Sequence, residues 1–246
     1  MAPSFVHGKG ARIYAGNKPI YTILQSIDVD HTCDTPETTV FGNGDRTYQS
    51  GGVREADMSF DGFYDGGSSE AQKLIEDALG STAPTTITYG MGGAATGARA
   101  RLVTTLPVGF GVQSMATDVV KVTASVKPTS RMDYGVFLLN ETAVTTTGSS
   151  TAVSRDNGST AASSNGGVGH FHLIAQSTLT SLVVKVQHSS AAVSWADLIT
   201  FTAATGITVQ RSTVAGTVKR YVRATRSTFT GGAGKSVQAV VAFGRR

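Results

Sequence analysis

The segment from Thr38 to Gly66 constrains the fold most, because a glycine-studded connection leads there into a strictly alternating strand. Over residues 53–64, apolar side chains share one face and carboxylates the other: Ala56, Met58 and Phe60, against Glu55, Asp57 and Asp61. The connection before it, residues 34–52, is too long for a hairpin turn of about two to five residues. Long loops in compact domains are functional or disordered, and this one carries no catalytic pattern. An extended arm on a half-buried sheet therefore indicates assembly with other subunits.

The composition predicts a mainly β protein. Of 246 residues, 40% are hydrophobic and 15% are charged, so charge is low against the roughly 25% typical of soluble domains. Thr, Ser and Gly take its place, which favours strands joined by many turns. The net charge of +4 forms no basic stripe of the kind that nucleic-acid binders carry. A neutral surface of this kind suits a subunit that packs against its own copies.

Two further strands and one helix stand out in the first half. Residues 21–30 carry Ser26, Asp28 and Asp30 on one face, and residues 117–127 alternate valine and alanine with Lys121, Thr123, Ser125 and Lys127. A helix is predicted over 69–79, with Ser68 or Ser69 as its N-cap and Gly80 at its C-terminal end. Its apolar stripe is Ala71, Leu74, Ile75, Ala78 and Leu79.

The division into domains follows composition. Residues 141–167 are rich in Ser, Thr and Gly and carry almost no large apolar residue, so burial cannot order them. We expect a surface excursion or linker there, between an N-terminal β domain (1–140) and a C-terminal sandwich-like β module (168–246). The strands expected in the second module include 169–176, 181–188, 219–228 and 236–243. Its expected core is Leu182, Val184, Val186, Leu198, Phe201, Val222 and Phe243.

Patterns that carry chemistry are weak. His170 and His172 share a strand face, and with His188 they could bind zinc if they converged. No carboxylate or cysteine recurs beside them at ligand spacing, and we interpret them as polar residues of a solvent-facing strand. The segment GGAGKS (231–236) lacks the first glycine of a phosphate-binding loop, because Phe229 stands there. We expect no catalytic residue, no cofactor and no metal, so the chain is not expected to be an enzyme.

Two stretches resemble the major tail protein, or tail tube protein, of long-tailed, siphovirus-like bacteriophages. One is VFGNGDRTYQSGGVREADMSFDGFYDGG with the helix after it and DVVKVTASVKPTSRMDYGVFLL. The other is SLVVKVQHSSAAVSWADLITF, followed by GTVKRYVRATRSTF and SVQAVVAFGRR. The resemblance implies a tail-tube-type β-sandwich or barrel with one flanking helix. It also implies hexameric rings that stack into a hollow tube, through which the genome passes.

The resemblance assigns roles to residues of this chain. The loop 34–52 is expected to reach a neighbouring ring, with Phe41, Asp45, Arg46 and Tyr48 as candidate subunit contacts. A tube that conducts DNA must not bind it, so an acidic strand face is expected to line the channel. The candidates for this lining are Asp28, Asp30, Glu55, Asp57 and Asp61.

The expected partners are further copies of this chain and the tape-measure, tail-tip and tail-terminator proteins. DNA passes through without specific binding. The N-terminal sequence MAPSFVHGKG lacks the apolar core of a secretory signal, and no apolar run is long enough to cross a membrane. We therefore expect assembly in the host bacterial cytoplasm, no membrane insertion, and a final place in the virion tail.

The alternative from another class is a carbohydrate-binding β-sandwich of a tail tip or an adhesin. Trp195, Tyr221 and His188 would then form a platform on which sugars stack. Because the chain has only one tryptophan, core packing is the simpler role for Trp195. Residues 219–226 interleave basic and apolar side chains around Tyr221, a pattern that suits a nucleic-acid surface or a strand facing acidic subunits.

Overall fold

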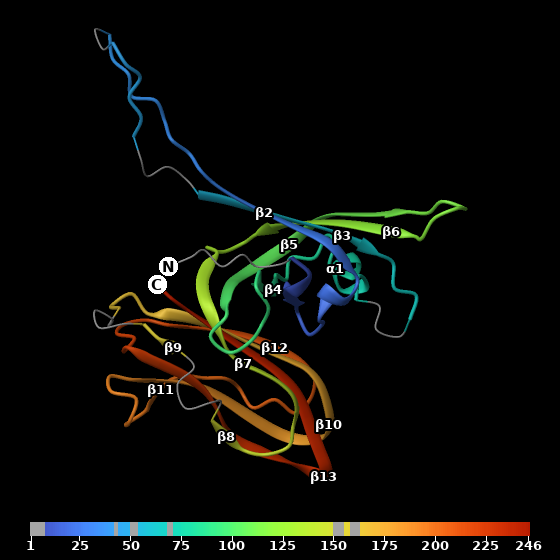
Figure 1. Ribbon diagram of the computed structural model, residues 1–246, viewed down its shortest axis with the longest axis vertical. Helices are drawn as coiled ribbons and strands as arrows, with labels where there is room; N and C mark the ends of the chain where they lie inside the picture. The colour runs from blue at the N-terminus through green and yellow to red at the C-terminus, as the bar shows by residue number, and fades with distance from the viewer. Residues whose placement is uncertain (1–7, 42–43, 50–53, 68–70, 150–154, 158–162) are drawn as a thin grey trace. The chain divides into compact units, whose positions relative to one another are not determined.

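The computed structural model describes residues 8–41, 44–49, 54–67, 71–149, 155–157 and 163–246. The chain forms two compact units, each built from separate stretches of sequence. Unit 1 comprises Met1–Thr22, Pro84–Thr105 and Ser130–Arg246, and unit 2 comprises Ile23–Ala83 and Leu106–Thr129. Over the described residues the protein is mainly β with one α-helix, as the sequence predicts (Figure 1). No helix in these ranges has the length and apolarity to span a membrane.

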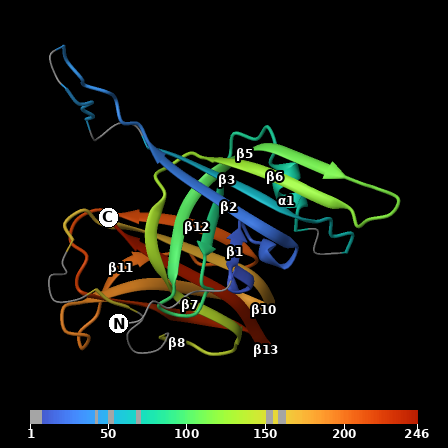
Figure 2. The ribbon, with the colours of Figure 1, turned by 45° about the horizontal axis from the view of Figure 1, so that its top comes forward.

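Unit 2 is a sheet with the strand order β5-β6-β3-β2 (Figure 2). Its strands are β2 (Leu24–Cys33), β3 (Arg54–Phe63), β6 (Lys121–Pro128) and the end of β5 (Arg99–Gln113), from Leu106 onward. Antiparallel register places Val29 opposite Met58 and Ile27 opposite Phe60. One sheet face is thus apolar, and its buried members are Met58, Phe60, Val122, Ala124 and Val126.

The helix α1 is shorter than predicted, spanning only Lys73–Asp77. Ala71 and Ile75 are buried, whereas Leu79 is 47% exposed, so the apolar stripe is used over little more than one turn. Short helices depend on such tertiary burial, and the helix ends where the burial ends. Gly80 adopts φ +79°, which suits its predicted place after the helix. The predicted caps Ser68 and Ser69 lie outside the described residues, and Gln72 occupies the N-cap position.

Unit 1 is built around two very long strands, β10 (Gly167–Ser189) and β13 (Tyr221–Arg245). Its other strands are β1 (Arg12–Ala15), β4 (Thr85–Gly90), the start of β5, β7 (Asp133–Val144), β8 (Gly148–Ser149), β9 (Arg155–Asp156), β11 (Ala196–Thr200) and β12 (Thr208–Val214). The path β1-β4-β5-β7-β13-β10 is hydrogen-bonded throughout, and β10 also pairs with β11 and β12. The short 3-10 helices η1 (Gly8–Gly10) and η2 (Ile20–Thr22) flank β1.

Four of the strands predicted in the C-terminal module, 169–176, 181–188, 219–228 and 236–243, form only two strands, β10 and β13. The predicted turn around residues 231–235 is a bulge within β13, because pairing with β10 resumes at Ser177 opposite Ser236. Thr178 with φ 51° and Gly234 with φ 71° absorb the local distortion. The glycines of residues 231–235 predict the end of a strand. In the structure, β13 continues through them because it pairs with β10 on both sides of the bulge.

The expected core of the C-terminal module is confirmed. All seven predicted residues belong to one cluster, in which Leu198 is the partly buried member. The same cluster includes Leu138 and Leu139 of β7, a strand placed by sequence in the N-terminal domain. Because β7 pairs with β13, with Leu139 opposite Val241, unit 1 crosses the division expected at residues 141–167. Within that excursion, β8 and β9 pair with β13.

The interpretation of His170 and His172 as solvent-facing is wrong, since both side chains are fully buried in unit 1. His172 Nδ1 donates to the Gly16 carbonyl (2.6 Å), so its Nε2 accepts from the Thr88 hydroxyl (2.8 Å). Thr88 Oγ1 in turn accepts from His170 Nδ1 (3.0 Å). This chain of bonds fits two neutral imidazoles, the form that burial favours. His188 has another contact, accepting from the Lys219 amide (3.2 Å), and no group of three potential metal ligands occurs among the described residues.

This buried pair predicts acid sensitivity. Burial lowers the pKa of His172 from 6.5 to about 4, and burial, with His172 and Arg211 nearby, holds that of His170 well below 6.5. Because the folded-state pKa values lie below those of the unfolded chain, the stabilisation is complete above about pH 6.5. It is lost as the pH falls from there towards 4.

We expect the melting temperature to fall over that pH range, and His172→Gln to weaken the dependence, because glutamine does not titrate. The matched control is His31→Gln, which alters an exposed histidine on β2. Circular dichroism melts from pH 7.5 to 4.5 would measure this. If the melting temperatures of wild type and His172→Gln depended on pH in the same way, the predicted role of His172 in acid sensitivity would be refuted.

Candidate functional site: an acidic sheet face and a projecting arm

The five carboxylates predicted to line a channel lie on one face of two adjacent strands. In the β2–β3 register, Asp28 stands opposite Ser59 and Asp30 opposite Asp57. Ser26 pairs with Asp61 and Thr32 with Glu55 in the same way. Opposed side chains on an antiparallel pair lie about 5 Å apart. Sequence indicates two separate acidic strips, and the register joins them into one surface, the acidic face.

Hydrogen bonds order part of the acidic face without neutralising it. Ser26 Oγ donates to Asp61 Oδ2 (2.9 Å). Lys127 Nζ lies 2.6 Å from Asp57 Oδ1 and 2.8 Å from Glu55 Oε1, and its bonds to Asp57 and then Glu55 raise its pKa. These ion pairs are exposed and contribute little stability. One lysine between two carboxylates leaves the surface acidic.

The neighbouring strands continue this face with small side chains. On β6, Ser125 stands opposite Ser59 and Thr123 opposite Asp61. On β5, Gly109 and Gly111 face the same two hydroxyl residues. An added Cβ would come within 2.6 Å of Ser125 Oγ or 2.9 Å of Thr123 Oγ1. The face is therefore smooth as well as acidic. The sequence reveals the polar row of β6, but not that Lys127 of that row contacts Glu55 and Asp57.

The connection between β2 and β3 is a projecting, paired arm rather than an irregular loop (Figure 1). Glu37 and Tyr48 form a bridge, Thr38 N donates to Thr47 O (2.8 Å), and Gln49 N donates to Pro36 O (3.0 Å). The described residues of the arm, 34–41 and 44–49, thus pair with each other in antiparallel fashion. Residues 42–43 and 50–53, which complete the predicted loop, lie outside the described residues.

The arm exposes large apolar side chains to solvent. Phe41 is fully exposed, Val40 is 65% exposed and Tyr48 is 58% exposed. The other predicted contact residues, Asp45 and Arg46, are exposed as well. A contiguous exposed apolar group with charges beside it is typical of a protein–protein contact. All four predicted contact residues are therefore accessible to another chain.

The rings proposed as a sugar platform are already occupied by this chain's own guanidinium groups. Arg223 lies 4.2 Å from the centre of the Trp195 ring, and Arg220 lies 4.8 Å from that of Tyr221. Trp195 is half-buried, so its expected role as a core residue is not met. Sugar stacking would have to displace these arginines, which disfavours the carbohydrate-binding alternative.

Comparison with known proteins gives matches only among solved structures; no family model and no curated protein matches. A chain of the virion of a native gene transfer agent has 10% identity and a TM-score of 0.43, over 52% of this chain and 97% of that one. The SPP1 tail tube protein has 11% identity and a TM-score of 0.43, over 52% of this chain and 77% of that one. The SPP1 Dit protein of the hub adsorption apparatus has 12% identity and a TM-score of 0.39, over 95% of this chain and 98% of that one.

The matched chains belong to structures of a gene transfer agent virion, a phage tail tube and a phage hub adsorption apparatus. At such identities and TM-scores the likeness concerns fold alone. No activity or partner of those proteins passes to this chain through it.

Proposed function

We propose that this chain is the structural subunit of a phage tail tube, and that its copies form stacked hexameric rings around a channel for the genome. The observation that supports this most is the acidic face, which has five carboxylates on a sheet whose opposite face is apolar. Each ring would present that face inward. The chain would act by its shape and charge, without catalysis.

The acidic face has the properties that a DNA channel requires. Contacts between basic side chains and phosphates hold DNA and would add up along many rings. Carboxylates on β2 and β3 repel the phosphates instead, and the small residues of β6 and β5 offer little to obstruct a duplex. DNA would pass without specific binding.

The sheet of unit 2 can close into a ring because it ends in two different edges, β2 and the last part of β5. Edge strands offer unpaired backbone groups to another chain. Pairing of one edge with the other edge of the next copy is a head-to-tail contact, which generates a closed ring when the rotation closes. The acidic faces of successive copies would then form a continuous lining.

The arm would connect rings. Phe41 and Tyr48 are the apolar anchors and Asp45 and Arg46 the charged contacts, all exposed in the single chain. The remaining partners in this proposal are the tape-measure, tail-tip and tail-terminator proteins. Assembly takes place in the host bacterial cytoplasm, and the finished subunit belongs to the virion tail.

The first test is electron microscopy of the purified, overexpressed protein, which should show tubes with an open channel. Deleting residues 42–51 should leave a folded protein that forms no tubes. The deletion removes Tyr48 and the segment next to Phe41, the two proposed anchors. Circular dichroism would verify folding, and sedimentation would measure assembly. Normal tubes from the deletion variant would exclude a role for the arm between rings.

The second test reverses charge in the channel. The triple variant Asp28→Lys, Asp57→Lys and Asp61→Lys should still assemble but should slow genome ejection, since lysines bind phosphates. The matched control reverses two exposed carboxylates on α1, Glu76→Lys and Asp77→Lys, and should leave ejection unchanged. DNA release from complemented phage is the measurement. A cryo-electron microscopy map with the three aspartates on the outer surface would contradict the proposal.

A further inference from the structure

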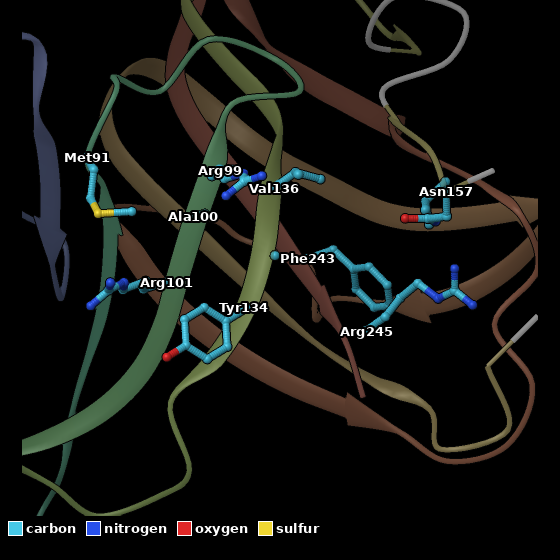
Figure 3. Close-up of a pocket in the computed structure, with 11 residues that line it drawn as sticks. Met91, Arg99, Ala100, Arg101, Tyr134, Val136, Asn157, Phe243 and Arg245 are labelled. Carbon is cyan, nitrogen blue, oxygen red and sulfur yellow. The ribbon is translucent and has the colours of Figure 1, made fainter. Parts of the chain in front are cut away.

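Unit 1 contains a cavity of about 370 Å³ lined by three arginines and no acidic residue among its described lining (Figure 3). Arg99 and Arg101 come from β5 and Arg245 comes from β13. The strand register sets them in two rows: Arg99 lies opposite Val136, which lies opposite Phe243, and Arg101 lies opposite Tyr134. Two strands, β5 and β13, therefore place three positive charges around one cavity, which we call the arginine pocket.

Two arginines of the pocket, Arg99 and Arg101, retain unused binding capacity. Arg101 Nε is buried without a hydrogen-bond partner, and its guanidinium lies 5.7 Å from the centre of the Tyr134 ring. No described ion pair includes Arg99 or Arg101. By contrast, Arg246 holds the buried Asp133 carboxylate through two bonds of 2.9 Å. An oxyanion placed between Arg99 and Arg101 would form charge-assisted hydrogen bonds of the same kind.

The arginine pocket also has an apolar rim and floor. Met91 is 41% exposed and Tyr134 is 52% exposed, beside the two arginines of β5. Below them Val136, Val222 and Phe243 are buried. A free inorganic anion would leave this apolar surface uncovered. The site instead suits a carboxylate next to a large apolar side chain.

We propose that the arginine pocket receives the arm of a second copy of this chain, with the Asp45 carboxylate between the guanidiniums and the Phe41 ring against Met91 and Tyr134. The arm has the complementary pair of features, since Phe41 is fully exposed and Asp45 is exposed four residues later. Glu37 adds to its acidic character. This inference rests on the proposed self-assembly and names the surface that the arm meets.

Binding of an arm peptide tests the inference. A fluorescein-labelled peptide spanning residues 36–49 is titrated into the full chain carrying Phe41→Ala and Asp45→Asn, so that its own arm does not compete. Arg99→Gln or Arg101→Gln in this chain should weaken binding about tenfold, the usual effect of losing a charged hydrogen bond. Arg131→Gln, which changes an exposed arginine outside the pocket, is the control.

A double-mutant cycle identifies the contact. If Asp45 contacts Arg101, the Asp45→Asn peptide should bind the wild-type pocket more weakly than the wild-type peptide does. In the Arg101→Gln pocket, the two peptides should bind with nearly equal affinity. A Phe41→Ala peptide should also bind more weakly. Thermal melts verify that the arginine variants are folded.

Three outcomes would overturn the inference: no peptide binding, binding unaffected by Arg99→Gln and Arg101→Gln, or displacement by inorganic phosphate with no contribution from Phe41. The last outcome assigns the pocket to free anions. Tubes formed normally by the folded arginine variants would also refute it while leaving the proposed function intact. If the peptide binds but the protein never forms tubes, the inference about the pocket stands and the proposed tail-tube function is refuted.

Discussion

The antiparallel register of β2 against β3 is the constraint on which the proposed channel depends. With Asp28 opposite Ser59 and Val29 opposite Met58, every carboxylate of the pair is directed away from the apolar side. A slip of one residue in either strand would exchange its two faces and would bury the carboxylates. Burial of Met58 and Phe60 resists such a slip, so the same contacts that stabilise unit 2 also produce its acidic face.

Unit 1 solves a different problem, which is how to hold polar groups inside a β core. The relay from Gly16 through His172 and Thr88 to His170 gives hydrogen-bond partners to three buried side chains, and only Nε2 of His170 is left without one. Asp133 is similarly satisfied by Arg246. β10, which carries both histidines, remains paired with β13 past the distortion at Thr178.

The exposed features of the chain match one another in chemistry. The described part of the arm presents an exposed aromatic ring and an exposed carboxylate, and the described lining of the arginine pocket holds guanidiniums and apolar side chains but no carboxylate. The carboxylates of the acidic face have no such receptor in this proposal, because their role is to repel.

The sequence by itself determined the strands, the inward residues and the acidic rows, because period-two alternation follows directly from strand geometry. It also determined the core of the C-terminal half, from Leu182 to Phe243, and the exposed arm residues. Only the tertiary structure decided which strands are neighbours. It joined the two acidic rows, merged four predicted strands into β10 and β13, and shortened α1 to the turns that find burial. It also buried His170 and His172, and gathered the pocket arginines from β5 and β13. These outcomes depend on pairing between residues far apart in the chain, for which local patterns carry no signal.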